Sequence, residues 1–380
     1  MRMIYLSPVP WASFSQRSHH FVAWYHEQTQ AQVLWIDPYP TRLPRQSDFK
    51  RKTAAPAPAT KEELSLEWLQ VVKPKVLPIE PIPGSGLLQT LLWREIINKA
   101  HAFAAEHPCM ICVGKPSELA LQLIERMPES YAVYDAMDDF PAFYKGISRR
   151  SMATRERLLV ERVSKILVSS TAIGKTLGAM GDKVELALNA CDIQKLAPLE
   201  SLVLDTKQQL LGYVGTIGSW FDWELVIALA KANPENRIQL IGPIFAPPPC
   251  LLPGNIELLP ERPHAEAIAA MATFSVGLIP FKLNRLTDSV DPIKYYEYRS
   301  LGLPVISTRF GEMALRDEEA AVWLIDENSD LRLTSRQALD YRCNFSRVQA
   351  FRQDNLWATR FSATRLLSDA RAGAPSRPGR

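Results

Sequence analysis

A lysine and a glutamate three residues apart are the side chains whose types and spacing most suggest ligand chemistry. Lys294 and Glu297 lie in the stretch DPIKYYEYRSLGLPVIST, residues 291–308. If the stretch is helical, the two side chains share one face. A diphosphate would meet Lys294 in the first turn, because the start of a helix already favours an anion. Glu297 would accept hydrogen bonds from both hydroxyls of the adjoining ribose. The pair therefore suits a nucleoside diphosphate; the alternative is an exposed ion pair, which stabilises little.

The ends of this helix are indicated by residues with known positional preferences. Asp291 suits the N-cap and Pro292 the first helical position. Gly302 suits the position just after a helix, and Pro304 follows it closely. We therefore expect a helix over residues 292–301 that leads directly into the apolar strand PVIST.

Two further motifs in the second half could contribute to a ligand site. The turn GYVGTIGSW joins an apolar strand to a helix that Asp222 could cap, and its glycines let the backbone approach a ligand. Gly215 and Thr216 would then line the cleft, although a plain tight turn is the alternative. The glycines do not have the GxGxxG spacing of a dinucleotide site. Arg262, which follows a strand, could pair with a phosphate or contact the edge of the nucleotide base. The alternative is an ordinary solvated arginine.

The first half offers a possible general base. The motif YDAMDDF places Asp135, Asp138 and Asp139 at the carboxyl end of a strand, where one of them could take a proton from an acceptor. Adjacent acids can instead bind a metal ion or cap the next segment. The motif QRSHHF opens the first helix and would place Arg17 and His20 at the mouth of the cleft. A histidine near a helix start is more often a structural hydrogen-bonding group than a base.

Composition limits the class of protein. The chain has 380 residues, of which 47% are hydrophobic and 22% charged, so two domains with sizeable cores are expected. The net charge of +3 gives no case for nucleic-acid binding. Neither a transmembrane run nor a signal peptide is evident. The five scattered cysteines favour free thiols and a cytoplasmic location, and the CxxC at Cys109 and Cys112 lies in an apolar strand rather than a convincing zinc motif.

Strands and helices alternate along both halves, which predicts an α/β protein with two doubly wound, Rossmann-like domains that face a cleft. In such sheets ligands lie at the carboxyl ends of the strands. We expect helical structure over 334–370 and a linker near 196–207. The predicted divisions are an acceptor-side domain, a donor domain, a C-terminal helix and a disordered tail, over residues 1–200, 201–352, 353–372 and 373–380.

The stretch PIKYYEYRSLGLPVIST resembles the P-x-K-x-Y-E-Y-x-x-x-G-x-P-V-x-S-T signature of GT-B nucleotide-sugar glycosyltransferases. The likeness is strongest to family-4-like bacterial enzymes of the exopolysaccharide, O-antigen or teichuronic-acid type. LLGYVGTIGSWFDWELV, NIELLPERPHAEAIAAM and YDAMDDFPAF agree with it in order. The resemblance implies that Lys294 contacts the donor diphosphate and Glu297 the ribose. It also implies a UDP-sugar donor, a glycan or lipid-linked acceptor, no metal or other cofactor, and a C-terminal helix that crosses back to the first domain.

One position departs from this signature. Family-4-like retaining enzymes usually carry a second glutamate eight residues before the ribose-binding one, and here that position is Ser289. Retaining and inverting stereochemistry therefore both stay open. The resemblance also favours acceptor or phosphate binding for Arg17 and His20.

The basic helix expected over 148–165, together with residues 42–52, would give the first domain a cationic surface. This surface could bind anionic lipid head groups and bring the enzyme to a lipid-linked acceptor, or it could simply be solvated. Two other functions fit the same fold: a nucleotide-sugar 2-epimerase, and a non-catalytic nucleotide-binding subunit of a polysaccharide assembly complex.

Overall fold

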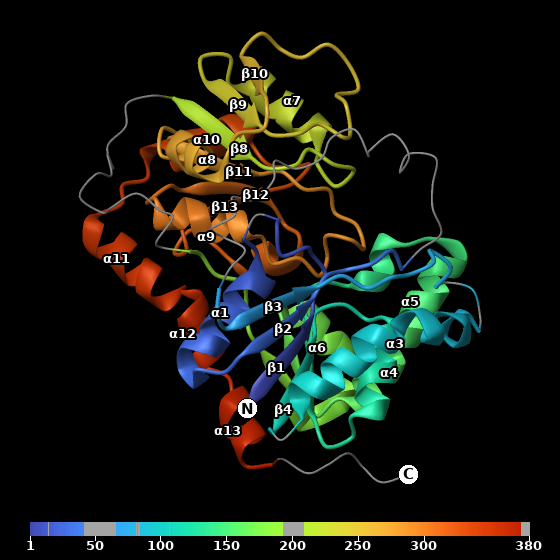
Figure 1. Cartoon of the computed structure of the whole chain (residues 1–380). Coiled ribbons are helices and arrows are strands. Elements are labelled where there is room, and N and C mark those ends of the chain that lie inside the picture. The colour runs from blue at the N-terminus through green and yellow to red at the C-terminus, as the bar shows by residue number, and fades with distance from the viewer. Residues whose placement is uncertain are drawn as a thin grey trace. The chain divides into compact units, whose positions relative to one another are not determined.

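The computed structural model describes residues 1–13, 15–41, 66–80, 82, 84–105, 107–192 and 209–373. The basic segment 42–52, the linker expected near 196–207 and nearly all of the expected tail lie outside these residues. The chain divides into two compact units (Figure 1). Unit 1 comprises Met1–Ser169, Ile173–Ala187 and Phe361–Arg380, and unit 2 comprises Ser170–Ala172 and Leu188–Arg360. The last helices thus belong to unit 1, although they follow unit 2 in the chain.

Unit 1 is built on a parallel sheet that has seven strands within the described residues, in the order β3-β2-β1-β4-β5-β6-β7. The strands are β1 (Arg2–Leu6), β2 (Val33–Ile36), β3 (Leu69–Val72), β4 (Cys109–Val113), β5 (Tyr131–Ala136), β6 (Lys165–Val168) and β7 (Val184–Leu186). The helices are α1 (Arg17–Thr29), α3 (Ser85–Ala104), α4 (Glu118–Arg126), η2 (Phe140–Phe143), α5 (Gly146–Arg162), η3 (Gly178–Lys183) and α13 (Leu366–Arg371), with α6 (Thr171–Leu177) and α12 (Trp357–Ser362) divided between the two units.

Two helical layers cover the sheet of unit 1. Trp93 of α3, Leu119 of α4 and Leu159 of α5 share one buried cluster with the inner strands. Phe21 of α1 packs edge-on against Phe361 of α12, with ring centroids 5.0 Å apart. Because both faces are covered, the strands are continuous apolar runs rather than alternating ones.

Unit 2 is a second parallel sheet, with the order β10-β9-β8-β11-β12-β13 within the described residues. Its strands are β8 (Leu210–Val214), β9 (Arg237–Ile241), β10 (Ile256–Leu259), β11 (Val276–Ile279), β12 (Val305–Thr308) and β13 (Val322–Ile325). Its helices are α7 (Trp223–Ala232), α8 (His264–Met271), α9 (Ile293–Ser300), η6 (Gly311–Leu315), α10 (Leu331–Asp340) and α11 (Phe345–Asp354). Helices α8, α9 and α11 share one core cluster and α7 and α10 another, so this sheet is also covered on both faces.

The end of α9 follows the sequence prediction closely. Gly302 adopts φ +79° directly after the helix. Its N–H donates to the carbonyl of Arg299, and the N–H of Leu303 donates to the carbonyl of Tyr298. This pair of bonds is the Schellman motif, which glycine favours because it has no Cβ to strain the left-handed backbone. The predicted stop at Gly302 is confirmed.

The start of α9 differs from the prediction. The helix begins at Ile293 with Pro292 as its cap residue, and no side chain caps it. Asp291 is not an N-cap, because its carboxylate is engaged in buried contacts elsewhere, which are described below. A second correction concerns Lys165, which we placed in the basic helix. It lies in β6, where it is buried and pairs with Glu185 at 2.7 Å and Asp369 at 2.6 Å.

The structure bears on the expectations for the cysteines, for metal binding and for membrane-spanning helices. All five cysteines are free, and Cys109 and Cys112 are buried in β4, as the apolar run predicted. Within the described residues, no cluster of histidine, cysteine and acidic side chains could hold a metal ion. Within the same residues, none of the helices has both the length and the apolar character that a bilayer crossing needs.

Candidate functional site

The strand order of unit 2 reverses between β8 and β11, which lie side by side. In a doubly wound sheet the connections from two such strands run to opposite faces, so a crevice opens at their carboxyl ends. The turn after β8 contains Gly215 and Thr216, and the loop after β11 leads to α9. Topology therefore brings these two sequence motifs to the same edge of the sheet.

At the start of α9, three side chains form a polar cluster. Lys294 and Glu297 are bonded to each other, as their spacing predicted. The second oxygen of Glu297 faces the Nε2 atom of His264, 3.6 Å away, in the first turn of α8. Glu297 is 9% exposed, whereas the side chains of Lys294 and His264 are 25% and 39% exposed. The carboxylate is thus enclosed while both of its partners reach solvent.

The surroundings of Glu297 favour its charged form. Burial alone would raise the pKa of Glu297, but Lys294 and His264 more than offset it, and the pKa is lowered from the usual range. The group therefore stays a carboxylate at neutral pH and can accept two hydrogen bonds from a diol. Lys294 beside it retains a charged donor for an anion at the helix start, where the first N–H groups lack intrahelical acceptors.

The glycine-rich turn is tied to α9 through the backbone. The N–H of Val214 donates to the hydroxyl of Tyr298 at 3.1 Å, so the residue before Gly215 contacts the residue after Glu297. Tyr213 donates from its hydroxyl to the carbonyl of Thr216 at 2.9 Å and holds the turn closed. Gly215 and Thr216 are half-buried. Asp222 caps α7 by accepting from the N–H of Leu225 at 3.1 Å, which confirms the expected cap.

The other two donor-side candidates, Arg262 and Ser289, lie near this cluster in sequence. Arg262 is exposed and stands two residues before His264, between β10 and α8. Ser289 is buried in the loop that leads to α9. Their roles in donor binding remain predictions.

Asp291 forms the buried support of α9. One carboxylate oxygen pairs with Arg316 at 2.8 Å. The other accepts from the N–H of Asn189 and from the hydroxyl of Tyr296, both at 2.8 Å. The side chain of Asp291 is 0% exposed, and the guanidinium of Arg316 also lies 3.8 Å from the ring centroid of Tyr295. This network fixes the chain just before Lys294.

In unit 1, Arg17 and His20, which were expected at a cleft mouth, each contact other residues of the same unit. Arg17 is buried and pairs with Asp135 at 2.8 Å, and it also donates to the carbonyl of Ala187 at 2.6 Å. His20 is half-buried, with its Nε2 atom 3.2 Å from the hydroxyl of Ser15. The ion pair of Arg17 supports a positioning role at the end of β5, and acceptor contact by Arg17 or His20 stays a prediction.

The acidic motif after β5 has a perturbed member. Burial raises the pKa of Asp138 to about 7; Arg17 opposes this shift, and Asp135 and Asp139 add to it. Asp139 precedes η2, but its side chain makes no capping bond. Glu156 of α5 accepts from the hydroxyl of Tyr134 at 2.7 Å, and burial raises its pKa to about 7 as well. A carboxyl group that titrates near neutrality suits proton transfer.

Sequence reasoning missed two of these residues, His264 and Glu156, and one contact, between Arg17 and Asp135. His264 lies 33 positions from Glu297, so no local spacing connects them. Glu156 lies in α5, a segment that we considered only for its basic residues. The partnership of Asp135 with Arg17 joins residues 118 positions apart. A histidine at the start of a helix that follows a strand was the one available signal for His264.

Comparisons with known proteins agree with this architecture. No family model matches the chain. The Bacillus subtilis (strain 168) protein TuaH, which is named as a teichuronic acid biosynthesis glycosyltransferase, is 25% identical over 198 residues. The match covers 46% of this chain and 50% of that protein, so the chain spans about half the length of the curated relative it matches.

Solved structures match over nearly the whole chain. The sucrose-phosphate synthase of Thermosynechococcus elongatus gives a TM-score of 0.62 at 14% identity, covering 98% of this chain and 100% of that one. Anabaena HepE, solved with UDP and glucose, gives 0.59 at 13% identity, covering 98% and 99%. At identities this low, structural similarity is evidence for a shared fold only. The chain therefore has the two-sheet GT-B fold, and its likeness to GT-B glycosyltransferases, first seen in the sequence, is confirmed.

Proposed function

We propose that this protein is a glycosyltransferase that moves a sugar from a nucleoside-diphosphate donor to a glycan or lipid-linked acceptor in the synthesis of a bacterial surface polysaccharide. The observation that carries the proposal is the cluster of Lys294, Glu297 and His264 at the switch point of unit 2. It combines a cation at a helix start with an enclosed carboxylate one helical turn away. That combination fits a diphosphate followed by a ribose.

The proposed chemistry uses the residues of unit 2 to stabilise the leaving group. As the bond between sugar and diphosphate breaks, negative charge builds on the phosphate oxygens. Lys294 and the start of α9 would neutralise that charge, and the stabilisation would be greatest in the transition state. Glu297 would hold the ribose, with His264 keeping the carboxylate in place. In this proposal these groups supply the positive charge without a metal ion.

We propose UDP as the nucleotide of the donor. HepE was solved with UDP and glucose, and a structurally similar Escherichia coli protein, matched with a TM-score of 0.60, was solved with UDP-2-fluoro glucose. The free thiols of the described residues are compatible with the cytoplasmic location that such a donor implies. Peripheral contact with an anionic membrane forms part of the same proposal.

A nucleotide-release assay tests this function. Purified protein would be given UDP-, GDP- and dTDP-sugars with a lipid-linked or glycan acceptor, in the presence of EDTA. We expect release of one nucleoside diphosphate that depends on acceptor and survives chelation. Conversion of the sugar to its epimer without acceptor would instead indicate the 2-epimerase. Tight nucleotide binding with no turnover under any acceptor would favour the non-catalytic subunit.

The acceptor base gives a prediction about pH. If Asp138 takes the acceptor proton, only its carboxylate form is active, and its pKa of about 7 places the change near neutrality. The specificity constant kcat/KM should therefore rise as pH increases through about 7 and then level off. Asp138→Asn should remove both the activity and this dependence. Asp182→Asn, at an exposed position of unit 1, serves as the control. A rise of the same shape in Asp138→Asn would show that another group titrates.

A further inference from the structure

An open groove lies in the helical layer of unit 1 that contains α3, α4 and α5. It has a volume of about 760 Å³ and is lined by α5, α4 and the first turns of α3. Its lining residues on α5 recur at every third or fourth position from Ile147 to Leu158, so one face of that helix forms a wall. This stretch is about 17 Å long at the rise per residue of an α-helix, which suits an elongated ligand.

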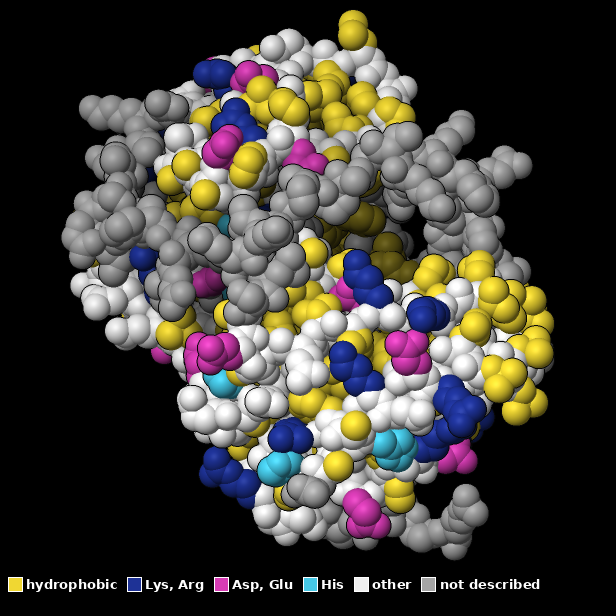
Figure 2. Space-filling view, viewed as in Figure 1, with side chains coloured by type: hydrophobic (Ala, Val, Ile, Leu, Met, Phe, Trp, Pro, Cys, Tyr) yellow, Lys and Arg dark blue, Asp and Glu magenta, His cyan; other side chains and the backbone are white. Residues whose placement is uncertain are grey.

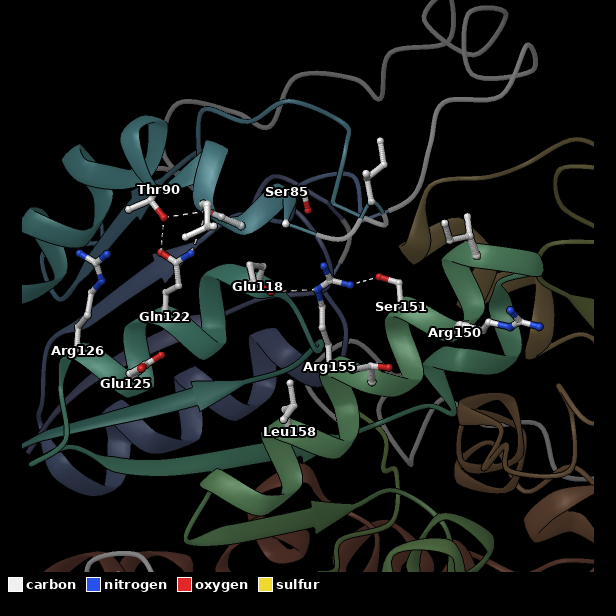
Figure 3. Close-up of a pocket in the computed structure, with 16 residues that line it drawn as sticks. Ser85, Thr90, Glu118, Gln122, Glu125, Arg126, Arg150, Ser151, Arg155 and Leu158 are labelled. Carbon is white, nitrogen blue, oxygen red and sulfur yellow. Dashed lines mark hydrogen bonds and ion pairs between the residues drawn. The ribbon is translucent and has the colours of Figure 1, made fainter. Parts of the chain in front are cut away.

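Hydrophobic, basic and acidic side chains are intermixed at this surface. Figure 2 shows all three kinds over the part of the molecule where Figure 1 places α3 and α5. Ile82, Leu87 and Ile147 line the groove and are 44%, 82% and 51% exposed. The polar side chains of Thr90 and Gln122 line the same groove (Figure 3). The lining therefore offers hydrogen bonds and apolar contact side by side.

The wall between α3 and α4 is held by hydrogen bonds. The hydroxyl of Thr90 donates to Oε1 of Gln122 at 3.3 Å, and Nε2 of Gln122 donates to the carbonyl of Gly86 at 3.2 Å (Figure 3). Gly86 lets the two helices approach, because a Cβ there would lie 2.5 Å from Oε1 of Glu118. A side-chain amide has two N–H groups and two acceptor lone pairs, so Gln122 keeps one of each for a ligand.

The charges of the groove nearly balance. Among the described residues, its ionisable lining consists of three arginines and two glutamates: Arg126, Arg150, Arg155, Glu118 and Glu125. Glu118 lies 3.5 Å from Arg155, and the buried Glu80 adds a carboxyl group 3.2 Å from the same guanidinium. Burial raises the pKa of Glu80. Three arginines against two or three carboxylates give the described part of the groove a net charge of +1 or 0.

We infer that this groove binds a chain of neutral sugars. A sugar ring carries hydroxyls around its rim and C–H groups on its faces, so it can use the hydrogen-bonding and the apolar side chains together. A nucleotide, a nucleic acid or an anionic head group is favoured by a surplus of cations, which this groove lacks. An acyl chain would cover the charged and polar side chains of the groove without giving them hydrogen-bond partners.

The course of the groove indicates how such a chain would lie. Helix α4 follows β4, and α5 follows β5 and η2, so both helices begin near the carboxyl ends of the strands. The reacting end of an acceptor would lie at those strand ends, and its remaining sugars would extend along α4 and α5. Identifying the bound chain as the acceptor rests on the proposed function. The inference adds that the acceptor is an oligosaccharide, recognised several sugars away from the end that reacts.

A binding titration of the full chain, without a donor, tests the inference. The probes are unbranched neutral oligosaccharides of glucose, galactose, rhamnose and N-acetylglucosamine, from monosaccharides to pentasaccharides, followed by saturation-transfer NMR. We expect at least one series to bind, with an affinity that grows with chain length until the groove is filled. Oligogalacturonates of the same lengths should bind at least about tenfold more weakly, because the groove has no surplus of cations.

Filling the groove tests where the sugars bind. Thr154 is an exposed residue of α5 that lines the groove, whereas its neighbour Ala153 is exposed on the same helix and is not among the lining residues. Thr154→Trp should weaken binding of the longest bound oligosaccharide at least about tenfold, and Ala153→Trp should leave it unchanged. Gln122→Ala removes hydrogen bonds without filling the groove and should weaken binding several-fold.

The inference would be overturned if none of the neutral series bound at millimolar concentration, or if the oligogalacturonates bound as tightly as the neutral chains. Equal affinities of Thr154→Trp and wild type would overturn it too, because the sugars would then bind elsewhere. A nucleotide titration of the same preparation reports on the donor site of unit 2 alone. Failure of the sugar-binding inference is therefore distinguishable from failure of the proposed function.

Discussion

Replacing Lys294 by alanine is expected to lower kcat for donor turnover by about 10²- to 10³-fold, with a smaller effect on KM. The reason is that negative charge on the departing diphosphate is greatest in the transition state, where a fixed cation contributes most. Replacing Glu297 by alanine should instead raise KM about tenfold with little change in kcat, because a ribose is held equally in the ground and transition states. Steady-state kinetics with a saturating acceptor would separate the two effects.

The matched control for Lys294→Ala is Lys231→Ala, which removes an exposed lysine from α7 in the same unit. Thermal unfolding of each variant would show that the fold persists, since Lys294→Ala leaves Glu297 with His264 as its remaining ionic contact among the described residues. Equal kcat in Lys294→Ala and wild type would mean that the lysine does not meet the leaving group. A loss of kcat in both Lys294→Ala and Lys231→Ala would point to a general effect of removing charge.

The largest effect on stability is expected at Asp291. Asp291→Ala would leave the guanidinium of Arg316, whose side chain is only 11% exposed, without its carboxylate partner. It would also remove the acceptor of the Asn189 N–H and the Tyr296 hydroxyl. Breaking a buried pair on one side typically costs about 3–5 kcal/mol, because the remaining charge is uncompensated. Urea unfolding monitored by tryptophan fluorescence would measure the loss in free energy of unfolding.

An exposed ion pair of the same unit provides the comparison. Asp340 pairs with Arg336 at 3.9 Å, and both side chains are largely exposed, so Asp340→Ala should cost at most about 0.5 kcal/mol. The double variant Asp291→Ala/Arg316→Met should recover part of the loss, because it removes the stranded charge. Similar stabilities for Asp291→Ala and Asp340→Ala would show that the buried network does not support α9.

The sequence was most informative where local rules decide the structure. Gly302 stops α9 because the Schellman turn needs a left-handed residue, and the (i, i+3) spacing brings Lys294 to Glu297. The strand–helix alternation predicted two parallel sheets because apolar runs between helices suit strands buried on both faces. Each of these depends on residues within about one helical turn or one strand of each other.

Contacts between distant segments were beyond that reasoning. Asp291 has the properties of an N-cap, yet its carboxylate pairs with Arg316, a largely buried arginine 25 positions later. Lys165 is the last residue of a basic stretch in the sequence. In the structure it lies in β6 and forms ion pairs with Glu185 of β7 and Asp369 of α13. The exposure of four leucines of α3, Leu87, Leu88, Leu91 and Leu92, could not be predicted either. Periodicity marks an apolar face, and α3 has apolar residues on both faces, of which packing buries only one.

A calorimetric titration of the wild type, Lys294→Ala and Glu297→Ala with UDP, GDP and dTDP in the presence of EDTA would measure the donor site itself. We expect saturable binding of one nucleotide, UDP, and an affinity at least about tenfold weaker in each variant. Failure of all three nucleotides to bind the wild type, or wild-type affinity in both variants, would contradict the proposed donor site. Lys294 and Glu297 would then be an ordinary ion pair at the start of a helix.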